Sequence, residues 1–119
     1  MSPKSKKIFL LYHNARCSKS RACLKIVSKK KILFKEVHYI KEGISLSKLE
    51  DIVNNLVSPL GNLVRTNEKD FKSNPFDITN KKLVVAFLNR YPSCLERPLF
   101  YNGNNYIICR PPEIVLDHI

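Results

Sequence analysis

The chain has 119 residues, a hydrophobic content of 44% and a formal net charge of +11. This length predicts a single domain over residues 7–119, preceded by a disordered basic tail over residues 1–6. The longest apolar runs, 8–12 and 83–88, are far too short to span a bilayer, so we expect no membrane association. The basic residues are spread along the chain without an aromatic-basic motif, so we expect no nucleic-acid partner.

The cysteine and histidine residues exclude the common metal and dithiol motifs. None of the four cysteines is spaced as Cys-x-x-Cys, and the three histidines are scattered along the chain. These spacings predict neither a zinc site nor a thioredoxin-type dithiol, and no metal ligand can be assigned. We expect reduced thiols in the cytoplasm.

The first half of the chain predicts a strand–helix–strand unit followed by a helix. An apolar segment predicts a buried strand over 7–12, residues 18–31 suit a helix, and residues 32–39 predict a second strand. Such a unit favours parallel strand pairing. Ser47 and Glu50 have the spacing of a capping box at the start of the next helix. That helix carries an apolar stripe at Leu49, Ile52, Val53, Leu56 and Val57.

The second half predicts more helices and then a hairpin. Pro59 and Gly61 end the preceding helix, and the segment 102–105 (Asn-Gly-Asn-Asn) predicts a hairpin turn. The expected elements are short helix 68–72, helix 79–89, strands 99–101 and 106–109, and a final helix from 111 to about 118. This order predicts an α/β thioredoxin-like fold, with a central mixed sheet of about four strands and a helical insert.

Cys17 is the clearest candidate for a chemical role. It lies where the first predicted strand gives way to the first predicted helix. The free amide groups at a helix start favour negative charge, and Arg16, Lys19 and Arg21 add positive charge nearby. Both effects favour the thiolate, the form that attacks electrophiles and disulfides. The sequence therefore predicts an activated sulfur nucleophile at this position.

Four groups of residues around and beyond Cys17 form a pattern that covers nearly all of residues 7–118. They are His-Asn-x-Arg-Cys-Ser-Lys-Ser-Arg at 13–21, Val-Arg at 64–65, Glu-Arg-Pro at 96–98 and Arg-Pro-Pro-Glu at 110–113. In content and order they resemble the glutaredoxin-dependent arsenate reductase family, especially its members of about this length. The resemblance implies that the Cys17 thiolate attacks arsenate, or a similar oxyanion, and forms a sulfur–arsenic adduct that external thiols reduce to arsenite.

The same resemblance implies the supporting residues and the partners. His13 and Ser20 would lower the pKa of the thiol, and Arg65, Arg97 and Arg110 would bind the oxyanion. A planar guanidinium can hold two oxygens at once, which suits this task. Glutathione would be the co-substrate and glutaredoxin the protein partner, with no tightly bound cofactor. The enzyme would be a cytoplasmic monomer.

Three positions near the motifs carry further expectations. Ala15 stands where the family usually has proline, so the loop before Cys17 is expected to be less rigid. Cys109 stands where close relatives often have glycine, and it is either a bystander or near enough to Cys17 to react. Cys23 is expected to face the core as a small apolar residue. The resemblance also implies a cis peptide bond between Arg97 and Pro98.

Three other functions fit the pattern less well, and the first of them fails on its spacing. A phosphatase-like arsenate reductase would need arginine six residues after the nucleophile, where this chain has Cys23. An Spx-type transcriptional regulator shares the fold and binds RNA polymerase, but usually has Cys-x-x-Cys where this chain has Ser20. A thiol oxidoreductase with another substrate also stays open, because fold and motif do not determine the substrate.

Overall fold

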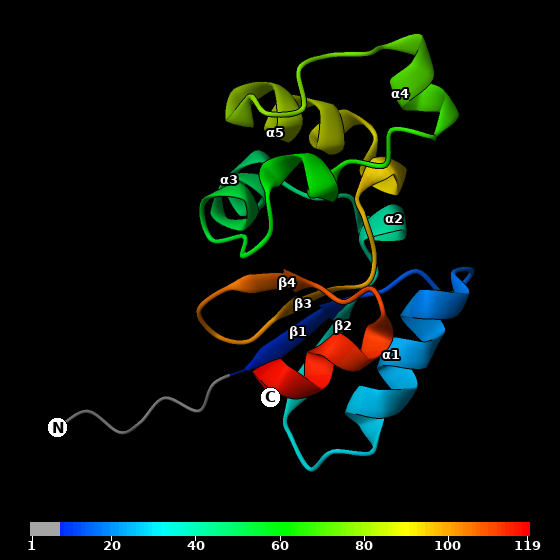
Figure 1. Cartoon of the computed structure of the whole chain (residues 1–119), viewed down its shortest axis with the longest axis vertical. Coiled ribbons are helices and arrows are strands. Elements are labelled where there is room, and N and C mark those ends of the chain that lie inside the picture. The colour runs from blue at the N-terminus through cyan, green and yellow to red at the C-terminus, as the bar shows by residue number, and fades with distance from the viewer. Residues whose placement is uncertain (1–7) are drawn as a thin grey trace, which may run out of the picture.

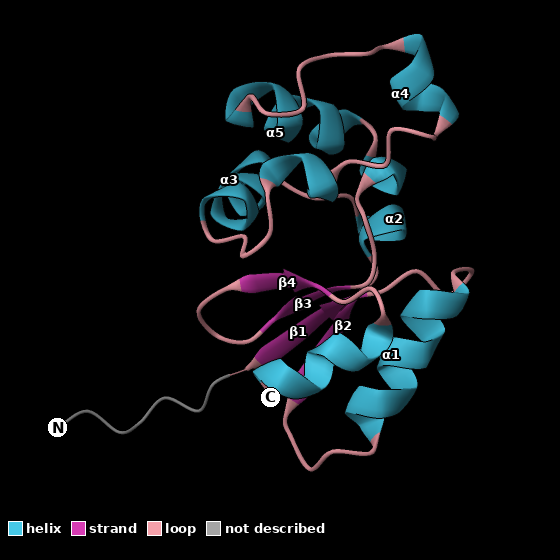
Figure 2. Ribbon diagram, in the orientation of Figure 1, coloured by secondary structure: helices cyan, strands magenta, loops and turns pink. Residues whose placement is uncertain are grey.

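The computed structural model describes residues 8–119, so the tail predicted over residues 1–6 lies outside the described residues. Its centre is a four-stranded mixed sheet, shown in Figures 1 and 2. β1 (Phe9–Tyr12) pairs in parallel with β2 (Phe34–Val37) and antiparallel with β3 (Leu99–Tyr101), which pairs antiparallel with β4 (Tyr106–Ile108). The order of the strands across the sheet is β2-β1-β3-β4. The predicted mixed sheet of four strands is confirmed.

The register of the sheet brings three distant chain segments to one edge. Tyr12, the last residue of β1, lies opposite Leu99, the first residue of β3, and Leu99 lies opposite Ile108, the last residue of β4. The segment after β1, the segment before β3 and the segment after β4 therefore meet at this edge. Cys17, Arg97 and Arg110 belong to these three segments.

Helices cover one face of the sheet through a small apolar core. α1 (Ser18–Ser28) and the C-terminal 3-10 helix (Pro112–His118) lie together on this face (Figure 1). Side chains alternate between the two faces of a strand, and Leu11, Phe100 and Ile107 point to this one. They pack with Val27 of α1 and Val115 of the C-terminal helix.

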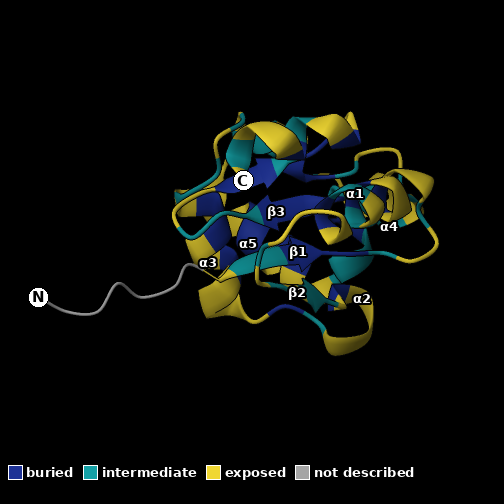
Figure 3. Ribbon diagram, turned by 90° about the horizontal axis from the view of Figure 1, so that it is seen from below, coloured by how far each residue is buried: buried dark blue, intermediate teal, exposed yellow. Residues whose placement is uncertain are grey.

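The other face carries the larger core and the remaining helices. α2 (Tyr39–Glu42), α3 (Leu46–Asn54), α4 (Lys69–Ser73) and α5 (Lys81–Arg90) all lie on this side (Figure 1). Figure 3 shows buried central strands and helices whose outer surfaces are exposed. Buried residues of this core include Tyr12, Leu49, Ile52, Leu63, Val84, Leu88 and Leu99. No helix among residues 8–119 has the length and apolar character needed to cross a membrane.

The start of α3 differs from the prediction. The Ser45 hydroxyl, not that of Ser47, accepts a hydrogen bond from the backbone amide of Lys48, at 3.1 Å. Ser47 lies inside the first turn of the helix, so the predicted capping box with Glu50 is wrong. Ser45 has extended backbone angles, as a capping residue requires, and this places its hydroxyl over the free amides of the first turn.

Several other helices and strands begin or end at residues that differ from the prediction. α1 ends at Ser28 rather than near residue 31, because its buried stripe ends at Val27 and only lysines follow. Tyr39, expected in the second strand, begins α2, and its fully buried ring lies 6.4 Å from that of Tyr12. The hairpin turn is confirmed, because Asn102 Oδ1 accepts hydrogen bonds from the backbone amides of Asn104 and Asn105. The Arg97–Pro98 peptide is cis as predicted, and Arg110–Pro111 is also cis.

Candidate active site

Cys17 is the N-cap residue of α1, at the edge of the sheet described above. Its backbone is extended, with φ −96° and ψ 122°, and its amide donates a hydrogen bond to the carbonyl of Asn14 at 3.0 Å. Its own carbonyl accepts the first helical hydrogen bond, from Arg21 N at 2.9 Å. The side chain is half-buried and faces the free amides at the helix start. The predicted strand-to-helix position of the sulfur is confirmed.

The surroundings of Cys17 favour the thiolate. Burial opposes ionisation, but the backbone amides of Ser20 and Lys19 and the positive charge of Arg97 outweigh it. The net result is a pKa for the Cys17 thiol below its ordinary value. A thiol of lowered pKa that solvent can reach is the usual property of a reactive cysteine.

His13 and Ser20 lie together beneath this loop. The Ser20 hydroxyl is fully buried, accepts a hydrogen bond from Asn14 N at 3.0 Å and lies 2.6 Å from His13 Nδ1. Burial lowers the pKa of His13, so its imidazole is neutral at neutral pH and can accept the Ser20 hydroxyl hydrogen. The hydroxyl thus holds the loop, while it is the Ser20 backbone amide that faces the sulfur.

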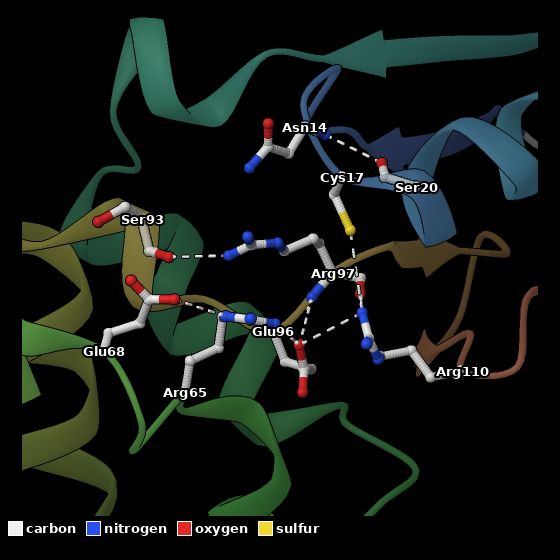
Figure 4. Close-up of polar contacts among 9 residues, drawn as sticks. All are labelled: Asn14, Cys17, Ser20, Arg65, Glu68, Ser93, Glu96, Arg97 and Arg110. Carbon is white, nitrogen blue, oxygen red and sulfur yellow. Dashed lines mark hydrogen bonds and ion pairs between the residues drawn. The ribbon is translucent and has the colours of Figure 1, made fainter.

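Two of the three predicted arginines, Arg65 and Arg110, direct their guanidinium groups at the carboxylate of Glu96, and Arg97 contacts it through its backbone amide (Figure 4). Arg65 Nη1 donates to Glu96 Oε1 at 2.6 Å, and Arg110 Nη1 lies 3.9 Å from the same oxygen. The backbone amide of Arg97 also donates to Glu96 Oε1, at 3.1 Å. We call Arg65, Arg97 and Arg110 the arginine cluster. Arg65 is further held by Glu68, whose Oε2 accepts from Nε at 3.2 Å.

Arg110 and Arg97 link this cluster to the sulfur. Arg110 Nη1 lies 3.9 Å from Cys17 Sγ and donates to the carbonyl of Arg97 at 2.9 Å. Arg97 Nη1 donates to the carbonyl of Ser93 at 3.1 Å. The Arg97 Nε is buried and has no hydrogen-bond partner among the described residues. The cluster therefore presents donors of fixed direction beside a nucleophilic sulfur.

The topology explains why these arginines meet. The antiparallel β3–β4 ladder, extended by the bond from Cys109 N to Pro98 O at 3.0 Å, sets Arg97 and Arg110 across from each other. Arg65 comes from the helical side of the molecule. A short bridge positions it, in which Arg65 N donates to Cys94 O and Glu96 N donates to Leu63 O, both at 2.8 Å.

Two residues of this site were missed from the sequence. Glu96 belongs to the Glu-Arg-Pro motif at 96–98, but the motif alone indicates no role for its carboxylate. Tyr39 was placed in a strand, but its buried hydroxyl has no hydrogen-bond partner among residues 8–119. Burial raises the pKa of Tyr39 to about 12, and the charges of Arg97 and Cys17 also act on it, so the hydroxyl lies near the site.

The other cysteines lie in the interior. Cys23, Cys94 and Cys109 are fully buried, and all four cysteines are free thiols. Cys109 shares the smaller core with Cys23, and the hydrogen bond between the two sulfurs, together with burial, raises the pKa of Cys109. Cys23 faces the core as expected, and Cys109 faces Cys23. Within residues 8–119, no group of three or more acidic, cysteine or histidine side chains could hold a metal ion.

Comparison with known proteins identifies the family. The sequence model of the ArsC family matches residues 12–118. The chain belongs to the ArsC family. This ArsC-family protein is 31% identical over 112 residues to an arsenate reductase of Haemophilus influenzae, covering 91% of this chain and 96% of that protein. It is 32% identical over 107 residues to an arsenate reductase of Neisseria meningitidis, covering 87% and 91%.

A solved structure supports the fold. The arsenate reductase from Vibrio cholerae superposes with a TM-score of 0.84 at 23% identity, covering 97% of the ArsC-family chain and 100% of that structure. The predicted α/β thioredoxin-like fold and the resemblance to arsenate reductases are confirmed.

Proposed function

We propose that this ArsC-family protein is an arsenate reductase in which the Cys17 thiolate attacks the arsenic of a bound arsenate. The observation that carries the proposal is the 3.9 Å contact between Cys17 Sγ and Arg110 Nη1, beside two further guanidinium groups. Attack forms a sulfur–arsenic bond, and one arsenate oxygen takes up protons and leaves as water. Relatives that are named arsenate reductases support the choice of substrate.

The arginine cluster is proposed to bind the oxyanion. Charge develops on the arsenate oxygens as the sulfur attacks, and donors held in advance stabilise that charge without reorganising. Glu96 and Glu68 hold the Arg65 guanidinium in place, and the Ser93 carbonyl holds that of Arg97. The unpaired Nε of Arg97 supplies a donor that no described residue uses.

His13 and Ser20 are proposed to activate Cys17 through the shape of the loop. Their hydrogen bond and the bond from Asn14 N to the Ser20 hydroxyl fix the first turn of α1. With the turn fixed, the amides of Lys19 and Ser20 stay directed at the sulfur, which favours the thiolate.

External thiols are proposed to reduce the adduct, with glutathione as the co-substrate and glutaredoxin as the protein partner. Reduction of As(V) to As(III) takes two electrons, and two thiols supply them by forming one disulfide. In sum, arsenate and two thiols give arsenite, one disulfide and one water. Cys23, Cys94 and Cys109 are each fully buried, which supports an external source of the second thiol. We further propose a single-domain monomer that works in the cytoplasm, where its free thiols stay reduced.

The test is an assay of arsenite formation with glutathione and glutaredoxin, using wild type, Cys17→Ser and Cys94→Ser. Cys17→Ser should be inactive and Cys94→Ser active, with circular dichroism showing that both fold. Turnover by Cys17→Ser would contradict the mechanism. Turnover with thioredoxin but not with glutaredoxin would contradict the proposed donor alone. Failure with arsenate, combined with reduction of another thiol-reactive substrate, would contradict the proposed substrate.

A further inference from the structure

A cleft opens beside loop 13–16, which leads into Cys17, and neither Arg65 nor Arg110 lines it. It has a volume of about 880 Å³ and lies between loop 13–16 and the start of α2, with Ser93 and Arg97 also lining it. This volume falls within the range of sites that bind small molecules. We call it the cationic cleft, because Arg16, Lys41 and Arg97 line it together with one carboxylate, Glu42.

We propose that the cationic cleft binds the reducing thiol as an acidic peptide thiol of the glutathione type. The inference rests on the proposed function, which requires such a thiol but does not locate it. Glutathione carries two carboxylates and one ammonium group, and the cleft offers three cations and one anion. Arg16 and Lys41 form no ion pair with any residue in the described part of the chain, so both are available to carboxylates.

The position of the cleft relative to the sulfur supports this occupant. Loop 13–16 leads directly into Cys17, so one wall of the cleft is continuous with the nucleophile. Arg97 lines the cleft through a guanidinium held on the Ser93 carbonyl at 3.1 Å, as Figure 4 shows. Arg97 thus borders both the cleft and the arginine cluster. A thiol bound in the cleft would approach Cys17 from the side that the oxyanion does not occupy.

The cleft also has an apolar portion that suits the body of a small peptide. The Ile40 side chain is 47% exposed and lines the cleft next to Lys41. An apolar contact of this kind can hold the methylene groups of the ligand while charged groups at either side bind its carboxylates. A simple thiol such as cysteamine lacks those carboxylates, and it would gain little from Arg16 or Lys41.

Binding is tested with S-methylglutathione, which keeps the charges of glutathione but cannot react. Titration of ¹⁵N-labelled wild-type protein should shift the amide signals of loop 13–16 and residues 38–42. Lys41→Gln and Arg16→Gln should each raise the dissociation constant about two- to fivefold, as expected for exposed charge pairs. Lys25→Gln removes the same charge from an exposed position of α1 and should have no effect. Shifts confined to another face, or an equal effect of Lys25→Gln, would overturn the inference.

Kinetics separate this inference from the proposed function. Lys41→Gln should raise the KM for glutathione about two- to fivefold, while the KM for arsenate and the rate with cysteamine stay unchanged. Binding of S-methylglutathione in the cleft without arsenate reduction would refute the function and keep the site. Arsenate reduction with an unchanged KM for glutathione in both variants would refute the site and keep the function. An effect on the KM for glutaredoxin alone would also refute the proposed thiol site, and would indicate a protein-docking surface instead.

Discussion

Replacing Arg110 with glutamine is expected to raise the pKa of the Cys17 thiol and so to slow its alkylation. Arg110 Nη1 lies 3.9 Å from Cys17 Sγ, and glutamine removes the positive charge from that position. A positive charge stabilises the thiolate but not the neutral thiol. Its loss therefore shifts the equilibrium toward the protonated form at every pH below the thiol's pKa.

The size of the effect follows from this distance. Two unit charges 3.9 Å apart interact by about 1 kcal/mol in a water-like dielectric and by about 4 kcal/mol at an effective dielectric constant of 20. The Arg110 side chain keeps 33% of its surface exposed, so the water-like value applies best. About 1 kcal/mol corresponds to an about fivefold smaller thiolate population at low pH. A more basic thiolate is also more nucleophilic, so the alkylation rate should fall about two- to fivefold.

The assay is the rate of iodoacetamide modification as a function of pH, followed by mass spectrometry. Cys23, Cys94 and Cys109 are fully buried, so modification of the native protein should report on Cys17. Arg90→Gln, at the exposed end of α5, is the matched control and should react like wild type. An alkylation profile unchanged in Arg110→Gln would refute the electrostatic argument.

Arg110→Lys separates charge from geometry. Lysine keeps the positive charge, so the alkylation profile should stay close to that of wild type. An ammonium cannot reproduce the planar fork of donors, so kcat/KM for arsenate should fall about tenfold or more. Equal loss of alkylation rate in the lysine and glutamine variants would show that the charge of Arg110 does not set the reactivity of Cys17.

Three further predictions concern stability, measured by urea unfolding. Ser20→Ala should lower the free energy of unfolding by about 1–3 kcal/mol, because it leaves the buried His13 Nδ1 unpaired. Alkylation of Cys17 should also slow, because the Ser20 hydroxyl fixes the turn that directs the backbone amides at the sulfur. Full stability would contradict the first expectation. Ser45→Ala should cost about 1 kcal/mol and Ser47→Ala less than about 0.5 kcal/mol, and the reverse order would contradict the observed cap. Tyr39→Phe should leave stability unchanged or raise it, because it removes a buried hydroxyl that has no hydrogen-bond partner among residues 8–119; a clear loss would show that this hydroxyl is paired.

Activity should also depend on pH in a direction set by Cys17. The proposed attack needs the thiolate, and the folded protein holds the pKa of Cys17 below its ordinary value. Turnover should therefore be lost as the pH falls through this lowered pKa, and it should be present above it. A pH profile of kcat/KM for arsenate that rises on acidification would contradict the role of the thiolate.

Local signals explain why Cys17 could be predicted from the sequence. A short apolar run, a polar turn and a helical segment follow one another within about twenty residues, and these determine the position of the sulfur. The hairpin at 102–105 was predictable for the same reason, because its residues form the turn themselves. Such features depend on neighbours in the chain and need no knowledge of the tertiary structure.

The arginine cluster could not be derived from local patterns. Arg65 and Glu96 are 31 residues apart, and two backbone hydrogen bonds of a short bridge bring them together. Arg97 and Arg110 meet only because of the register of β3 and β4. Similarity to a family singled out these arginines. The same similarity did not indicate a role for Glu96. That role follows only from its contacts with Arg65 and Arg110, which lie far from it in the chain.

The predicted helix boundaries were wrong where the sequence alone allows more than one solution. Ser45 and Ser47 are both acceptable caps, and only the observed path of the chain, which is extended at Ser45, selects between them. Tyr39 has a high preference for strands, but burial of its ring beside Tyr12 places it in a helical turn instead. Tertiary packing thus decided the cases that propensity left undecided.

The carboxylate of Glu96 gives the arginine cluster an internal counter-ion. Without it, the guanidinium groups of Arg65 and Arg110 would repel each other, in a chain of net charge +11. Because Glu96 is part of the polypeptide, this neutralisation persists at any salt concentration and does not need a dissolved ion. The resting protein should therefore keep its shape in phosphate-free buffer.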